Sequence, residues 1–137
     1  MRVPRKRIVE LVAYVSRRQK RRITELDIAI VNDEQMAADN MRYLKHKGTT
    51  DVISFDLSDD FSDGIVAQFI ICADVAVREA AERKHGVQRE LMLYVVHGLL
   101  HMMGYDDIQA DMAAKMHVRQ ETLLNDFLVF SSGETGG

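Results

Sequence analysis

Cysteine is almost absent from this sequence of 137 residues. The single one, Cys72, excludes an internal disulfide and is typical of a protein kept in a reducing compartment, so we expect a cytoplasmic location. Because Cys72 ends an apolar stretch, a buried and unreactive thiol is the simpler interpretation of it. The length predicts a single domain over residues 1–137 that needs no covalent crosslink.

Apolar runs long enough to cross a membrane are also missing. The longest, around residues 91–103, is interrupted by His97 and His101, and the basic N-terminus lacks the apolar segment of a signal peptide. We therefore expect a soluble protein without a membrane partner. The tail SSGETGG after Phe130 contains no apolar residue, which predicts disorder from about residue 131.

Positive charge is not in excess, since the net charge is -3, but the basic residues are unevenly distributed along the chain. Nine basic residues lie at or before Arg22 against Glu10 alone, while the rest of the chain has nine basic and twenty acidic residues. This asymmetry can build a local basic face that attracts a phosphate backbone. A solvated amphipathic helix explains the same pattern equally well.

Hydrophobic periodicity and capping residues predict helices mixed with strands. Helices are expected over residues 4–18, from Asn32 to before Gly48, from an Asp74 cap to Lys84, and over residues 88–103 and 108–126. Strands are expected over residues 26–31, 50–57 and 65–71, the last two joined as a hairpin by the polar loop 56–64. The fold class is therefore α+β: a small mixed β-sheet of three to four strands packed with about five helices, around the apolar helix that carries the histidines.

Two histidines on this helix indicate a metal site. His97 and His101 are four residues apart, so both imidazoles project from one helical face, one turn apart. Gly104 favours a left-handed helix end, after which the chain can turn back and bring the carboxylate of Asp107 beside the two rings. Such a His, His, Asp set leaves a coordination position for water, as catalytic metal sites do.

The third ligand has alternatives. Asp107 precedes the pattern of the last helix, so it can instead be that helix's N-cap. Asp106 can serve as cap or ligand, and His117 is a further nitrogen donor in the last helix. The histidine pair itself can also be read as core residues, although the spacing to Gly104 and Asp107 favours the metal.

Two known families share this spacing. Metzincin proteases carry H-E-x-x-H-x-x-G-x-x-H, but here Gly98 stands where those enzymes keep a glutamate general base, which disfavours a metallopeptidase. The stretch from His97 to Asp106, HGLLHMMGYD, resembles the H-G-x-L-H-L-x-G-Y-D-H signature of the YbeY family. Residues 40–43 and 50–55, NMRY and TDVISF, are similar to two further blocks of that family, and the likeness spans roughly residues 25–125.

The resemblance implies a zinc-dependent, single-strand-specific endoribonuclease. It further implies action on ribosomal RNA, in 16S rRNA 3′ end maturation and ribosome quality control, with the small ribosomal subunit as a partner. Zinc, one ion per chain, is the expected cofactor, although a carboxylate ligand also suits manganese, nickel or iron. The expected metal ligands, which would also be the catalytic residues, are His97, His101 and Asp107.

Three departures from the family pattern bear on catalysis. Asp107 replaces the last histidine of the signature, Leu44 replaces the arginine that follows the family's tyrosine, and Ala67-Gln68 replaces a Gly-acid pair. Arg42 and Lys45 are the cations expected to contact substrate in place of that arginine. Ser54, which resembles a family position lining the cleft, is a further residue expected to contact substrate. The alternative function is a metal-stabilised, ribosome-binding maturation factor with little cleavage activity.

Overall fold

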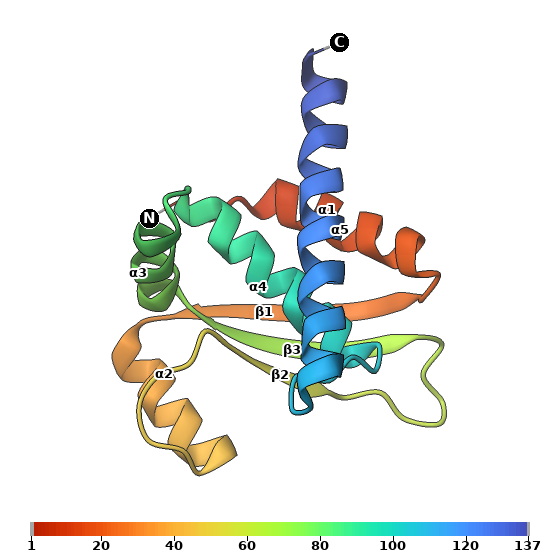
Figure 1. Cartoon of the computed structure of the whole chain (residues 1–137). Coiled ribbons are helices and arrows are strands. Elements are labelled where there is room, and N and C mark those ends of the chain that lie inside the picture. The colour runs from red at the N-terminus through yellow and green to blue at the C-terminus, as the bar shows by residue number, and fades with distance from the viewer. Residues whose placement is uncertain (1, 137) are drawn as a thin grey trace.

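The computed structural model describes the backbone of residues 2–136 and the side chains of residues 2–131 (Figure 1). The elements follow one another as α1 (Arg5–Gln19), β1 (Ile23–Val31), α2 (Asp33–Asp39), the π-helical turn η1 (Asn40–Leu44), β2 (Val52–Asp56), β3 (Ile65–Cys72), α3 (Ala73–Arg83), α4 (Val87–Met102) and α5 (Ala110–Gly136). The order and type of these elements confirm the prediction from periodicity.

The three strands form one mixed sheet in the order β1-β3-β2. β3 runs parallel to β1 and antiparallel to β2, so the predicted hairpin is confirmed. No fourth strand occurs among residues 2–136, and the sheet has the smaller of the two expected sizes. The α+β class is therefore confirmed, with β3 as the central strand.

The two faces of the sheet are covered unequally (Figure 1). Helices α1, α4 and α5 lie on one face, where alternate residues of β3 join the main core. On the other face α2 covers a small cluster of Met36, Ile53, Ile70 and Cys72. Cys72 is buried, as expected, and burial raises the pKa of its thiol.

Helix α4 is the centre of the main core. Ten of its residues are buried, on all sides of the helix. Gly98 makes this packing close, since a Cβ added there would lie 2.8 Å from the ring of Phe69 on β3. The Phe69 ring fills the space that a side chain at position 98 would need.

One local prediction is wrong. Asp74 does not cap α3: it lies inside the first turn, and its carboxylate accepts a hydrogen bond from the backbone N–H of Asp33 on α2. Helix α5 continues to Gly136, and the expected disorder of the tail from about residue 131 stays a prediction. Among the described residues, no helix combines the length and apolar character needed to cross a bilayer.

Candidate metal centre

Three side chains with metal-ligating atoms meet at the C-terminal end of α4. The carboxylate Oδ2 of Asp107 lies 3.7 Å from Nε2 of His97 and 3.5 Å from Nε2 of His101. One ligand atom from each residue lies within 4.8 Å of the others. The structure therefore brings together the three residues that the sequence singled out, two from a helix and one from the bend after it.

The bend that carries Asp107 has a definite backbone cause. The N–H of Gly104 donates to the carbonyl of His101, and the N–H of Tyr105 donates to the carbonyl of Leu100. Together with φ +98° at Gly104, these bonds form a Schellman motif, which ends the helix and reverses the chain. The predicted left-handed residue is thus present, and it is what returns Asp107 to the helix face.

The alternatives for the third ligand have different positions. The carboxylate of Asp106 accepts a hydrogen bond from the backbone N–H of Ile108, so Asp106 takes the local capping role. His117 is exposed on α5 and is not in the cluster. Asp107 is about half exposed, at 49%, whereas His97 and His101 are 24% and 30% exposed. The cluster is consequently open to solvent on the side of the carboxylate.

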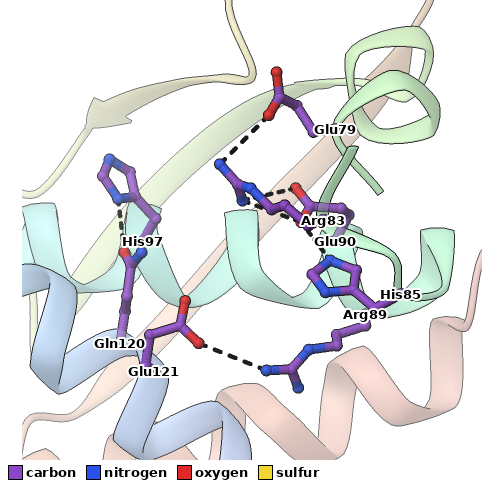
Figure 2. A network of polar contacts seen from close by, with 8 residues as sticks. All are labelled: Glu79, Arg83, His85, Arg89, Glu90, His97, Gln120 and Glu121. Atoms are coloured by element: carbon purple, nitrogen blue, oxygen red, sulfur yellow. Dashed lines mark hydrogen bonds and ion pairs between the residues drawn. The ribbon is translucent and has the colours of Figure 1, made fainter. Parts of the chain in front are cut away.

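Gln120 is a fourth residue of the site that the sequence did not suggest to us. Its side-chain oxygen lies 2.9 Å from Nδ1 of His97, and Gln120 is only 9% exposed (Figure 2). Because the amide oxygen accepts, Nδ1 of His97 carries the proton and Nε2 is left free toward Asp107. A signal was available: Gln120 is a polar residue that interrupts the apolar stripe of α5 formed by Met116, Leu123, Leu124 and Phe127.

Polar contacts hold α5 in place for this role. Arg89 of α4 donates to Asn125 at 2.9 Å and lies 3.5 Å from the carboxylate of Glu121 (Figure 2). On the other side of α5, Arg119 donates to the side chain of Gln19 at 2.7 Å. Two neighbouring helices therefore fix the rotation of α5 that points Gln120 at His97.

The opposite end of α4 holds a buried carboxylate. Glu90 is fully buried, accepts from Arg83 at 3.1 and 3.2 Å, and lies 2.5 Å from Nε2 of His85 (Figure 2). Partial burial acts to lower the pKa of Arg83, but Glu90 outweighs it and the net pKa is raised. This network anchors the turn between α3 and α4 and lies at the end of the helix remote from the metal cluster.

The residues expected to contact substrate fall on two sides of the sheet. Arg42 lies over the ring of Tyr43 at 5.2 Å, and Tyr43 contacts Phe55, whose side chain packs on the α2 face. Lys45, just after η1, is exposed in the same segment. Ser54 alternates with Ile53 and Phe55 along β2 and so points to the α4 face. Of the three, only Ser54 is on the side of the metal cluster.

The distances in the cluster suit a bound metal ion. Four ligands around an ion at bond lengths of about 2.0–2.2 Å lie roughly 3.3–3.6 Å from each other in a tetrahedron. The two separations from Asp107, 3.5 and 3.7 Å, are close to that range, and all three ligand atoms lie within 4.8 Å of one another. Two imidazoles and one carboxylate leave the fourth position for a small molecule, which is the arrangement of catalytic sites.

Comparison with known proteins agrees with this geometry. The family model described as "Endoribonuclease YbeY" matches residues 3–128 of the chain. The chain belongs to the YbeY family. It is 31% identical over 131 residues to endoribonuclease YbeY of Acidothermus cellulolyticus, covering 86% of this chain and 80% of that protein. It is 36% identical over 110 residues to endoribonuclease YbeY of Staphylococcus carnosus, covering 75% of this chain and 72% of that protein.

A solved structure shares the fold of this chain as well. The solution structure of TM1509 from Thermotoga maritima matches with a TM-score of 0.66 at 18% identity, over 98% of this chain and 89% of that one. At this identity the likeness concerns the fold alone. In this YbeY chain the protease-like spacing has no glutamate at position 98, where the Phe69 ring fills the space beside the glycine. A metallopeptidase therefore lacks its general base here.

Proposed function

We propose that this protein is a metal-dependent endoribonuclease that hydrolyses phosphodiester bonds of single-stranded RNA. One observation carries the proposal: in a chain of the YbeY family, His97, His101 and Asp107 present their ligand atoms to one point that is open to solvent. Hydrolysis requires attack of a water oxygen on phosphorus, cleavage of the bond to a ribose oxygen, and transfer of a proton to that leaving oxygen.

Zinc is the metal that we propose for the site. The separations of 3.5 and 3.7 Å between ligand atoms suit a tetrahedral ion, whereas octahedral magnesium at about 2.0–2.1 Å brings neighbouring ligands to roughly 2.9 Å. Two nitrogens and one oxygen also favour zinc, with manganese, nickel and iron as competitors. Such an ion supplies a Lewis acid that activates water and polarises a phosphoryl oxygen.

The protein groups have separate tasks in this proposal. His97 and His101 bind in their neutral form, and Gln120 keeps the proton of His97 on Nδ1. Asp107 contributes a negative charge, so the site has one positive charge less than it would with a third histidine, and we expect a weaker Lewis acid. Ser54, on the α4 face of β2, is the proposed hydrogen-bonding contact to the substrate on the sheet side.

We propose ribosomal RNA as the substrate, in maturation of the 16S rRNA 3′ end and in ribosome quality control, with the small ribosomal subunit as the partner in the cytoplasm. Family membership and the names of the relatives support this choice of an RNA substrate. The exposed position of Asp107 leaves room for a polymeric substrate to reach the site.

The proposal is tested by incubating a labelled single-stranded RNA with the purified protein, with zinc, with other divalent ions, and after chelation. We expect metal-dependent internal cleavage that is lost in His97→Ala. Metal binding is measured on the same samples by competition with a chromophoric chelator. Absence of cleavage in a fully loaded wild-type protein would contradict the enzyme proposal.

A second candidate is a ribosome-binding maturation factor with little cleavage activity. It is supported by Leu44 at the position of the family's arginine and by the location of Arg42 and Lys45 beyond the far face of the sheet. This candidate predicts co-sedimentation with small ribosomal subunits and retained metal, without metal-dependent cleavage. The two measurements on one preparation therefore separate the candidates.

A further inference from the structure

Cationic side chains surround the bend of residues 102–107 on the side of α1 and α5. Lys20 and Arg21 come from the turn between α1 and β1, and Lys115 and Arg119 come from α5. We refer to these four residues as the basic rim. They are far apart in sequence, so their common position next to the bend that carries Asp107 is a property of the fold.

The α1–β1 turn is attached to the end of the metal helix. Nη1 of Arg21 donates to the carbonyl of Met103 at 3.4 Å. Lys20, Arg21 and Arg22 also line a surface pocket together with Met102, the residue that directly follows His101. These cations therefore lie beside Met102 and Met103, the two residues that follow the metal-ligand candidate His101.

The α5 half of the basic rim is continuous with the first half. Lys115 and Arg119 line a shallow, largely apolar groove with Tyr105, two residues before Asp107. Gln19 joins the two halves: it accepts from Nε of Arg119 at 2.7 Å and donates to the hydroxyl of Tyr105 at 3.5 Å. An apolar floor between two cations fits a nucleotide, because a base has an apolar face and the backbone is anionic.

The charge of the basic rim is available for a ligand. Among the described side chains, Lys20, Arg21, Lys115 and Arg119 form no ion pair with a carboxylate. Arg22 is different, since the carboxylate of Asp63 lies 3.1 Å from its guanidinium. Asp56 also lines the pocket that Arg22 lines. We therefore leave Arg22 out of the basic rim.

We propose that the basic rim binds the phosphate backbone of single-stranded RNA and leads the strand to the metal centre. This inference rests on the proposed function and deepens it by naming the surface that holds the substrate. It also accounts for the missing cation at Leu44: charge that cannot reach the cluster from η1 is supplied from the α1–β1 turn and from α5. Two of the nine basic residues near the N-terminus, Lys20 and Arg21, then have a role in this proposal.

The test measures binding without cleavage. Fluorescence anisotropy of a labelled single-stranded RNA is recorded in the presence of a chelator, as a function of salt, for wild type and Arg21→Gln/Arg119→Gln. We expect about 10-fold weaker binding and a salt slope smaller by about 1.4, because each lost phosphate contact on a single strand contributes about 0.7. The matched control is Arg5→Gln/Lys6→Gln, which removes two exposed cations at the other end of α1 and should leave both values unchanged.

Two more variants separate charge from structure. Arg119→Lys keeps the charge and should bind RNA like wild type. Gln19→Leu removes the link to Tyr105 without changing any charge, and it should also bind RNA like wild type. Equal losses in the control pair and in the basic-rim pair, or no loss in the latter, would overturn the inference. A failure of the proposed function is distinguishable, because it appears as absent cleavage in a metal-loaded protein whose RNA binding still depends on the basic rim.

Discussion

The side-chain oxygen of Gln120 accepts a hydrogen bond from Nδ1 of His97 at 2.9 Å, which ties the last helix to the metal helix. An imidazole that binds a metal through Nε2 needs its proton on Nδ1, and a buried carbonyl acceptor stabilises that tautomer. Since Gln120 is neutral, it orients the ring without adding negative charge to a site that already contains Asp107. Metal affinity should therefore depend on a residue that does not touch the ion.

Replacing Gln120 by leucine should weaken zinc binding by about 10-fold or more, as is common when the partner of a ligating histidine is removed. The affinity is measured by competition with a chromophoric chelator, and the tautomer of His97 by nitrogen NMR of the metal-free protein. We expect the Nδ1–H form to lose its predominance in the variant.

The control for this substitution is Gln19→Leu, which removes the contacts of Gln19 with Arg119 and Tyr105 but leaves His97 untouched. Because Arg89 still holds α5 through Asn125 and Glu121, zinc affinity should stay within about twofold of wild type. An equal loss of affinity in both variants would assign Gln120 to the docking of α5 and not to the orientation of His97.

Asp107 and Asp106 offer a matched pair of acidic residues with different roles. Asp107→Asn should lower zinc affinity at least about 10-fold, because an amide is a weaker ligand than a carboxylate and leaves the ion with more uncompensated charge. Asp106→Asn should preserve it, since asparagine can also accept the hydrogen bond from the Ile108 N–H. Isothermal titration of the metal-free proteins measures both. The reverse order of effects would make Asp106 the ligand.

Gly98→Ala should destabilise the protein by up to about 2 kcal/mol. Overpacking against the Phe69 ring, 2.8 Å from the new Cβ, costs about 1–3 kcal/mol, and the better helix propensity of alanine offsets about 1 kcal/mol. Gly86→Ala, at the N-cap of the same helix, meets nothing within 4 Å and should cost no more than about 0.5 kcal/mol. Urea unfolding curves give both values, and equal stabilities would show that the ring moves aside freely.

Glu90 should matter for stability and not for metal binding. Glu90→Gln removes the charge from a fully buried group that Arg83 and His85 contact, so we expect a loss of about 1–3 kcal/mol in the free energy of unfolding. Glu79→Gln affects an ion pair in which both side chains are more than 40% exposed, and should cost less than about 0.5 kcal/mol. Zinc affinity should be unchanged in both variants; a drop in Glu90→Gln would indicate coupling along α4.

The sequence was most informative where local spacing determines geometry. The i, i+4 pair of His97 and His101 and the left-handed Gly104 specify directions that hold in any α-helix and any Schellman motif, so the cluster with Asp107 could be predicted. Alternation and turn residues likewise predicted β2, β3 and their hairpin.

Contacts between distant segments were not predictable in the same way. Gln120 is 23 residues from His97 and reaches it only through the docking of α5 on α4, which no local pattern encodes. Asp74 satisfies the cap preference in sequence, yet tertiary packing gives its carboxylate to the backbone of Asp33. The basic rim is a similar case, because the charge asymmetry was visible while its meeting with Lys115 and Arg119 required the fold.

The contact of Phe69 with Gly98 joins the central strand to the helix turn between the two histidines. A bulkier residue at position 98 would push the turn that sets the spacing of the ligating nitrogens, and a smaller residue at position 69 would leave a void beneath it. A change at either position should therefore appear as altered metal loading before the domain unfolds.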